Sequence, residues 1–197
     1  MVRDPAGQAG KPQLFEFGFS FSTAAGNRPL DHTTPGPNSK LAACYNHANG
    51  IRTVFYQDVS PTDSYVWYTR VDKTSGKLSD ELLVVVGVCV LTWVWPTGNK
   101  INFTNNSRSN TPLAAISIAR DGGEFMYLYY VDNSNLLLRT VYSEAAQSWT
   151  TPGMISTQAD PVGQKSSLAV VADLTRKVNL IYYRLDNKQY SAGKDNW

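Results

Sequence analysis

Six side chains in this sequence are of the types that bind sugars or other small ligands. An aromatic ring offers a flat surface to the apolar C–H face of a sugar, and a guanidinium offers paired donors to neighbouring oxygens. The ligand-binding candidates are Arg52, Trp67, Arg70, Tyr127, Arg139 and Trp149. The alternative is that the tryptophans pack between sheets and the arginines are solvated strand ends, since aromatic residues are common in strands.

Patterns typical of catalysis or metal binding give no comparable signal. His32 follows Asp31 in a long loop and His47 lies in an expected turn. Such a His–Asp pair could do acid–base work, but we expect both histidines to be exposed loop residues. A glycosidase would need two carboxylates that converge on one bond, and only Asp80 and Glu81 are adjacent. No metal-ligand spacing, phosphate loop, nucleophile elbow or dinucleotide fingerprint is present, so we expect no cofactor and no metal.

The composition predicts a neutral, β-rich protein. The chain has 197 residues, of which 42% are hydrophobic and 17% charged, with a formal net charge of +2 and abundant tyrosine and tryptophan. Aromatic residues of this abundance favour strands. Lysine and arginine form no cluster that would neutralise phosphates, so we expect no nucleic-acid partner. The longest apolar run, residues 82–95, is too short to cross a bilayer as a helix, and we expect no membrane partner.

The two cysteines and the N-terminus bear on the compartment. Cys44 and Cys89 both lie in apolar runs, which predicts buried free thiols, although the count leaves a disulfide open. Residues 1–7 contain no hydrophobic core, so we expect no secretory signal. This favours a cytoplasmic location over a secreted one.

One pattern occurs three times along the chain. Each copy begins with Ser or Thr, a spacer, Leu-Ala and a small residue, and each ends with an aromatic segment followed by Asp. From the Leu to the Asp the copies measure 17, 19 and 18 residues. The copies run from Ser39 to Asp58, from Thr111 to Asp132 and from Ser166 to Asp186. A fixed internal spacing of this kind indicates a repeated supersecondary unit.

Each copy predicts three antiparallel strands joined by tight turns. Asn-Gly and Asp-Gly dipeptides, which tolerate positive φ, favour a hairpin after the first strand. We expect second strands at residues 52–56, 125–130 and 179–183, and third strands at 65–70, 136–142 and 189–191. A polar link then leads to an apolar segment at 82–86 and at 154–155, which would form a fourth strand. The third copy ends before its fourth strand.

These strands predict an all-β fold, a β-propeller built of four-stranded antiparallel blades. Units of about 50 residues match the usual blade length, so the chain holds about three to four blades. The repeat units are residues 39–86, 111–155 and 166–197 of a single domain, 1–197. A β-sandwich is the alternative, but a sandwich has no reason to repeat the Leu-Ala segment at the same place in each unit.

The number of blades leaves the closure of the ring open. Single-chain closed propellers usually have four to eight blades, more than this chain holds. Phenylalanine alternates with other residues over 14–21, which predicts a strand, and a loop rich in Gly, Pro and Asn follows at 22–38. Either this N-terminal strand completes the last sheet, or two chains assemble as a homo-oligomer to close one ring.

The first and second copies resemble the blade of fungal fucose-specific lectins. The likeness is carried by Ile51–Asp58 after Leu-Ala-Ala, and by Pro112–Ser117 followed by Tyr130–Asn135, Leu136–Arg139 and Ser148-Trp149. It covers residues 39–197 apart from 82–110. The resemblance implies a six-bladed propeller with sugar pockets between adjacent blades. In that family each pocket uses an Arg from the second strand, a Glu or Gln from the third and an aromatic residue from the neighbouring blade.

Most of the corresponding pocket positions hold other residues in this chain. Counted back from the end of each second strand, the Arg position holds Thr53, Tyr127 and Leu180. Arg52 lies one place from that position, and a shift of one residue reverses the face of a strand. The same counting places Trp67 and Arg139 at the Glu position, and Trp149 alone where a family aromatic is expected.

We therefore expect a lectin-like β-propeller that recognises a glycan between blades and has no catalytic activity. The alternative is a lectin-fold propeller enzyme, a cofactor-free cyclase or pericyclase of fungal secondary metabolism such as a hetero-Diels–Alderase. That chemistry needs an apolar, aromatic pocket that holds a reactive conformer. The expected ligand is accordingly a glycan or a small apolar molecule.

Overall fold

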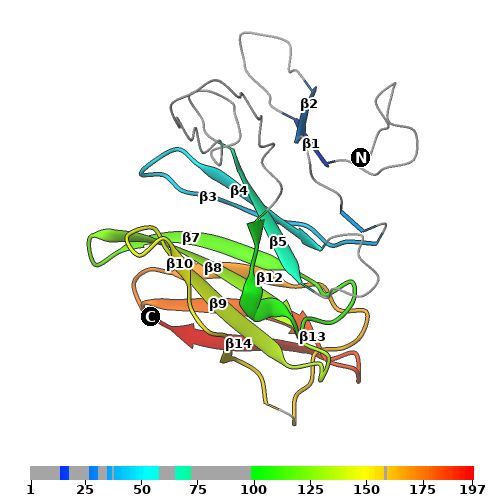
Figure 1. Ribbon diagram of the computed structural model, residues 1–197. Helices are drawn as coiled ribbons and strands as arrows, with labels where there is room; N and C mark the ends of the chain where they lie inside the picture. The colour runs from blue at the N-terminus through cyan, green and yellow to red at the C-terminus, as the bar shows by residue number, and fades with distance from the viewer. Residues whose placement is uncertain are drawn as a thin grey trace, which may run out of the picture.

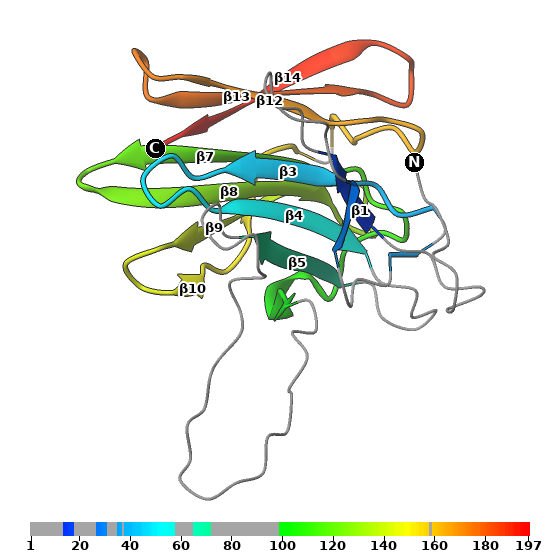
Figure 2. The same cartoon turned by 90° about the horizontal axis from the view of Figure 1, so that it is seen from above.

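The computed structural model of the chain describes residues 14–17, 27–30, 35–36, 38–57, 65–71, 99–157 and 159–197. Within these residues the fold is all-β, and the one helical element is a turn of 3-10 helix at Asn102–Thr104. Three antiparallel sheets follow one another along the chain and stack face to face, from cyan to red in Figure 1 and from above in Figure 2. No helix in this part of the chain is long and apolar enough to cross a membrane.

The first sheet is a four-stranded meander. Its strands are β3 (Ala42–Tyr45), β4 (Arg52–Gln57), β5 (Val66–Val71) and β6 (Asn99–Lys100). The first three strands confirm the expected pattern. The fourth strand, next to β5 at the edge of the sheet, is β6 (Asn99–Lys100). The segment expected as the fourth strand, residues 82–86, lies outside the described residues.

The second sheet repeats this order. It contains β7 (Ala114–Arg120), β8 (Gly123–Val131) and β9 (Leu137–Ser143), and then β10 (Ser148–Trp149) and β11 (Gly153–Met154), which both pair with β9. The β7–β8 turn has positive φ at Asp121 and Gly122, 49° and 75°. A two-residue loop needs positive φ at both central residues to match the twist of the strands, so the Asp-Gly signal is confirmed.

The third sheet has three strands, β12 (Ala169–Asp173), β13 (Val178–Arg184) and β14 (Tyr190–Asn196). The expected third strand, residues 189–191, was too short. Its extension is rich in Gly, Lys, Asp and Asn, which strands disfavour, but it pairs with β13 over seven residues. Gly193 permits a close approach, because a Cβ there would lie 2.8 Å from Cγ2 of Ile155.

The N-terminal segment forms a separate hairpin. β1 (Leu14–Phe17) pairs antiparallel with β2 (Asn27–Leu30) in a two-stranded sheet. The expectation of a loop throughout 22–38 was therefore wrong at 27–30, where pairing with β1 overrides a weak strand signal that includes Pro29. Of the two alternatives for closing the ring, the one in which the N-terminal strand completes the last sheet is contradicted for residues 14–17, since β1 pairs with β2. Residues 18–21 lie outside the described residues.

A repeated hydrogen bond explains why each copy begins with Ser or Thr. In every copy the hydroxyl of that residue accepts a 2.8 Å hydrogen bond from the backbone N–H of the last residue of the second strand. The pairs are Gln57 to Ser39, Val131 to Thr111, and Arg184 to Ser166. The segment that enters each sheet is thereby fastened to the far end of the second strand.

The stacking of the sheets explains why β8 is apolar on both faces. β7 lies beside both β3 and β12, so the first strands of the three sheets are neighbours. Leu128 and Tyr130 belong to the cluster between the first and second sheets, whereas Tyr127 and Tyr129 belong to the cluster between the second and third. Because side chains alternate along a strand, this strand is buried on both sides.

Candidate functional site

The strand register decides which positions in the three sheets are equivalent. The anchor hydrogen bond aligns the last residues of β4, β8 and β13, and counting back from them makes Thr53, Tyr127 and Leu180 equivalent, as expected from the sequence. Trp67 and Arg139 are not equivalent. Trp67 pairs with Tyr56, one place from the residue that corresponds to the partner of Arg139.

The expectation that Trp67 and Arg139 share one position was therefore wrong by one residue. Arg139 pairs with Tyr129, and the residue at that place in the first sheet is Tyr68, which pairs with Phe55. The second and third strands are joined by turns of different length in the two copies, so counting along the sequence loses the register. A shift of one residue puts the two side chains on opposite faces of their sheets.

A charged pair joins the first and second sheets. The guanidinium of Arg70, on β5, donates to Oε1 of Glu144, which follows β9. Arg70 also donates to the hydroxyl of Tyr142 over 3.4 Å, and its guanidinium carbon lies 5.4 Å from the centre of that ring. The side chains are only 9% and 17% exposed, so the two charges compensate each other in a largely desolvated place.

Trp149 packs against three aromatic rings at the same interface. The centre of its ring lies 5.9 Å from Phe55, 5.5 Å from Tyr68 and 5.3 Å from Tyr142. Edge-on and tilted contacts at these distances are the favourable arrangements for aromatic pairs. These contacts agree with the alternative interpretation of Trp149, in which the tryptophan packs between sheets.

A hydrogen-bonded network joins the second and third sheets. The hydroxyl of Tyr129 donates to Oδ2 of Asp195 over 2.7 Å, and Arg139 donates to Oδ1 of the same carboxylate. Asn179 Nδ2 donates to the Tyr129 hydroxyl over 2.8 Å, and Trp197 Nε1 donates to Asn179 Oδ1 over 3.1 Å. Asp195 is buried, and each of its carboxylate oxygens accepts one of these hydrogen bonds.

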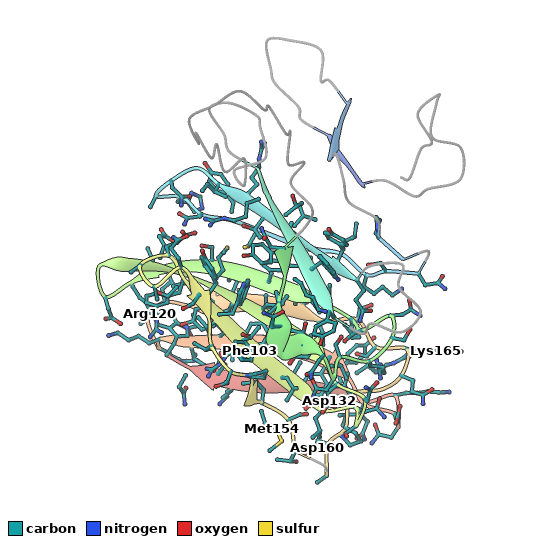
Figure 3. The ribbon with its side chains drawn as sticks, viewed as in Figure 1. Phe103, Arg120, Asp132, Met154, Asp160 and Lys165 are labelled. Carbon is teal, nitrogen blue, oxygen red and sulfur yellow. The ribbon has the colours of Figure 1, made fainter. Side chains whose placement is uncertain are left out.

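Arg120 lies at the same interface but forms none of the hydrogen bonds of this network. The guanidinium carbon of Arg120 lies 4.5 Å from the ring centre of Phe125, 5.7 Å from Trp197 and 5.8 Å from Tyr127. Figure 3 labels Arg120 at the turn between β7 and β8. The ion pair that Arg120 forms is with Asp121, where Nη1 lies 3.8 Å from Oδ2. Aromatic rings rather than a close anion therefore surround this cation.

Tyr127 is fully buried, yet its hydroxyl has no hydrogen-bond partner among the described residues. Burial raises the pKa of Tyr127, while the nearby charge of Arg120 lowers it and that of Asp195 raises it; Arg139 lowers it as well. Leaving a buried polar group unsatisfied costs about 1–3 kcal/mol. We call Arg120, Tyr127, Arg139 and Trp197 the candidate site.

Apart from the Tyr127 hydroxyl, which can donate and accept, the unsatisfied buried atoms found at the sheet interfaces are donors. They include the Nε atoms of three arginines and the Nε1 atom of one tryptophan, namely Arg70, Arg120, Arg139 and Trp149. An arginine or indole N–H can only donate. A partner for these atoms must therefore bring acceptor oxygens.

The six ligand-binding candidates are divided among three places. Arg70 and Trp149 lie between the first and second sheets, and Tyr127 and Arg139 between the second and third. Arg52 and Trp67 lie on the opposite face of the first sheet, because their strand neighbours Thr53 and Tyr68 contact the second sheet. The structure brings Tyr127 and Arg139 into one site but does not bring all six together.

Several residues that the sequence reasoning missed take part in these contacts, among them Arg120, Glu144, Asp195 and Trp197. Asp195 and Trp197 follow the segment expected as the last strand, and Arg120 lies at the end of β7, so no local pattern marked them. A signal for Asp195 was available in the Tyr-rich strand opposite, whose buried hydroxyls need acceptors.

The remaining polar candidates have structural surroundings. His47 is exposed in its turn, as expected, with its ring 4.7 Å from that of Tyr45, whereas Asp31 and His32 lie outside the described residues. Cys44 is a free thiol, and burial raises its pKa to about 12; Cys89 also lies outside the described residues. In the described part of the chain, no three His, Cys, Asp or Glu side chains gather in a way that would hold a metal ion.

Comparisons with known proteins identify the fold. No protein-family model matches the sequence, and neither does any curated protein. Two solved structures of a lectin from Aleuria aurantia are similar at 14% identity. One, a variant in complex with Fucα1-6GlcNAc, has a TM-score of 0.61 and matches 93% of this chain and 49% of its own. The other, described as a fucose-specific lectin, has a TM-score of 0.58 and matches 94% of this chain and 51% of its own.

This likeness confirms the fold that the repeats predicted. The identity is too low to transfer a ligand or a site, and the chain spans about half the length of the lectins that it matches. What is common to both is the arrangement of successive antiparallel sheets. The protein therefore has the β-propeller fold that the fungal fucose-specific lectin from Aleuria aurantia also has.

Proposed function

We propose that this protein binds carbohydrate at the candidate site between the second and third sheets. The similar structures are lectins, and one of them holds Fucα1-6GlcNAc. The observation that carries the proposal is the fully buried Tyr127 hydroxyl, which has no hydrogen-bond partner and feels the charges of both Arg120 and Arg139. A sugar oxygen at this place would satisfy a group whose burial is otherwise unfavourable.

The candidate site combines the two features that sugar recognition needs. The ring of Trp197 lies beside Arg120. The ring can therefore stack against the apolar face of a sugar while the guanidinium donates hydrogen bonds to its oxygens. The resemblance to fucose-specific lectins implies an Arg on the second strand and a Glu or Gln on the third strand of each pocket. In the second sheet of this protein those two positions hold Tyr127 and Arg139. The proposed carbohydrate binding would therefore work without the fucose-type pair of side chains at this site.

The chemistry of the candidate site selects among glycans. Each oxygen of Asp195 already accepts one hydrogen bond, from Tyr129 or from Arg139, and apart from the Tyr127 hydroxyl the unsatisfied atoms nearby are N–H donors. Among the unsatisfied atoms of the candidate site only the Tyr127 hydroxyl can accept from a ligand hydroxyl, whereas that hydroxyl and the Nε atoms of Arg120 and Arg139 can all donate. A sugar that presents a carboxylate, which only accepts when ionised, matches the site better than a neutral sugar.

A glycan array with neutral and acidic glycans, followed by calorimetric titration of the best ligand, tests the proposal. Tyr127→Phe removes only the unsatisfied hydroxyl, so the fold keeps or gains stability while the affinity falls about 2- to 12-fold, the value of one hydrogen bond. Tyr130→Phe is the matched control, since Tyr130 lies on the same strand and faces the first sheet. A blank array, or equal affinity of the two variants, would contradict the proposal.

The alternative of a cofactor-free cyclase would require an apolar pocket that holds one reactive conformer. No observation on the described residues favours it over binding. The array separates the two functions, because a blank result together with turnover of a polyene or a quinone methide would support the enzyme instead.

A further inference from the structure

The carboxylate of Glu144 is held by three side-chain donors where the first and second sheets meet, a contact that we call the first interface. Arg70 donates to Oε1, and Asn46 Nδ2 donates to the same oxygen over 3.5 Å. Gln147 Nε2 donates to Oε2 over 3.2 Å. Arg70 and Asn46 are buried, and both belong to the first sheet or the turn that follows its first strand. A carboxylate from the second sheet is thus bound by donors of the first.

The backbone fixes the orientation of Asn46 independently of Glu144. Oδ1 of Asn46 accepts hydrogen bonds from the backbone N–H groups of Ala48 and Asn49, over 2.9 and 3.3 Å. Because the oxygen of the amide is committed to the turn, the NH2 group is the part that points to Glu144. Asn46 is only 1% exposed, so this donor is held in place for an acceptor.

Tyr142 fixes the other two donors. Its hydroxyl accepts from Arg70 over 3.4 Å and donates to Oε1 of Gln147 over 2.9 Å. The guanidinium of Arg70 also lies over the ring of Tyr142. Since these contacts do not involve Glu144, the donors form a preorganised site for a carboxylate rather than a set of side chains that only Glu144 holds together.

Glu144 stands at the position that Trp197 has in the third sheet. Each lies seven residues after the residue of the third strand that pairs with the anchored end of the second strand. Each also donates its backbone N–H over 3.1 Å to an equivalent carbonyl, that of Glu124 for Glu144 and that of Lys177 for Trp197. One position of the repeat therefore faces the preceding sheet at both interfaces.

The two interfaces differ in what this position brings to a cation. At the first interface it brings a carboxylate to Arg70. At the candidate site it brings the ring of Trp197 to Arg120, whose guanidinium carbon lies 5.7 Å from the ring centre. An indole N–H can only donate, so Trp197 offers Arg120 no acceptor oxygen. The first interface contains its own carboxylate, whereas the unsatisfied donors of the candidate site have none.

We propose that the first interface contains a site for a small carboxylate, which Glu144 fills from within the chain, and that this filling keeps acidic glycans out of it. The first part rests on the three donors alone, and the second part rests on the proposed function. Separating two paired charges in a largely desolvated place is costly, so a ligand does not displace Glu144. Glu144 is then the residue that limits glycan binding to the candidate site.

The test uses acetate as the probe, because Glu144→Ala removes the atoms of one acetate ion and leaves Arg70 without its carboxylate. Urea unfolding is followed in sodium acetate and in sodium chloride at equal ionic strength. In chloride we expect the variant to be less stable than the unchanged protein. In acetate its midpoint should rise, and the ratio of folded to unfolded protein should grow about elevenfold at an acetate concentration ten times the dissociation constant.

Three variants separate a specific site from a general effect of salt on stability. Glu124→Ala is the matched control, because Glu124 is half-buried and its Oε2 accepts from Ser117, so its loss should create no response to acetate. Glu144→Gln leaves no space for acetate and should not respond. Arg70→Met combined with Glu144→Ala removes the cation and should abolish the response. If Glu144→Ala is too unstable to purify in chloride, refolding yields in the two salts give the same comparison.

Equal responses of Glu144→Ala and Glu124→Ala would overturn the proposal, and so would a response that survives the loss of Arg70. Calorimetric titration with an acidic glycan tests the second part. Glu144→Gln should leave the glycan affinity unchanged, and a change of more than about threefold would place the glycan at the first interface and overturn this part. If no glycan binds to the unchanged protein, the proposed function is wrong, and the acetate titration still decides whether the first interface is a carboxylate site.

Discussion

The hydroxyl of Tyr129, on β8, donates a 2.7 Å hydrogen bond to Oδ2 of Asp195, on β14. The two residues lie in different sheets, and Asn179 and Arg139 complete their hydrogen bonding. Around them the interface is apolar. A satisfied polar network inside an apolar contact strengthens each of its bonds and makes every missing partner costly. This network therefore specifies how the third sheet sits on the second.

Removal of the Tyr129 hydroxyl tests this role. Tyr129→Phe leaves Oδ2 of Asp195 and Nδ2 of Asn179 without their partner, and we expect the free energy of unfolding to fall by about 1–3 kcal/mol. Urea titration followed by tryptophan fluorescence measures it. Tyr182→Phe, on the exposed side of the third sheet, is the control and should change stability by less than about 0.5 kcal/mol. Equal effects of the two variants would contradict the role of the network.

The anchor hydroxyl of the second copy gives a second prediction. Thr111 Oγ1 accepts from the N–H of Val131 and donates to its carbonyl, both over 2.8 Å. Thr111→Val keeps the shape but loses both bonds in a fully buried place, so we expect a loss of about 1–3 kcal/mol in the free energy of unfolding.

Thr111→Ser is the matched variant, since it keeps the hydroxyl and removes a methyl group. It should retain most of the stability that Thr111→Val loses. If the serine variant were the less stable of the two, the methyl group rather than the hydroxyl would carry the effect.

Alkaline pH should weaken the fold through its buried tyrosines. Burial raises the pKa of Tyr127, Tyr129, Tyr130 and Tyr142. Above pH about 10 the unfolded chain releases phenolic protons that the folded chain keeps, so the unfolded state binds fewer protons and stability falls as pH rises. Below that pH this contribution is fully present.

Urea titrations at pH 8, 9.5 and 10.5, with absorbance at 295 nm to follow tyrosine ionisation, measure this effect. The buried tyrosines should ionise together with unfolding rather than before it. Stability that stays constant up to pH 10.5, with early ionisation of all tyrosines, would contradict the burial of these hydroxyls.

Cys44 should be chemically inert in the folded protein. Burial raises its pKa to about 12, and the nearby charge of Arg70 lowers it less than burial raises it. Because the thiolate is the reactive form, alkylation by iodoacetamide at pH 8 should be at least about 100-fold slower in the folded protein than in urea. The Cys89→Ser variant leaves one thiol to follow. Similar rates in both states would show that Cys44 is accessible.

Local patterns in the sequence were sufficient for the strands and turns. The anchor Ser or Thr, the Leu-Ala segment and the Asp-Gly turn act over a few residues, so they predicted β3 to β5, β7 to β9 and the propeller fold. They also placed Thr53, Tyr127 and Leu180 at one position, because each lies at a fixed distance from an anchored strand end.

Other features were decided only when distant segments met. The length of β14 depends on its pairing with β13, and the register of Arg139 depends on turns whose lengths differ between copies. Arg70 meets Glu144 across 74 residues, and Arg139 meets Asp195 across 56. No local pattern contains such partners, because a carboxylate is selected by the cation that it meets in space rather than along the chain.

By itself, then, the sequence determined the repeat, the strands and the turns, since these follow from backbone geometry over short distances. The tertiary structure decided which repeated positions became a packed interface, a charged network or an uncovered face. The physical reason is that Phe55, Tyr129 and Tyr182 are equivalent along the chain, but only the first two have another sheet on top of them. Whether a side chain is buried depends on the sheet that packs over it as much as on its own type.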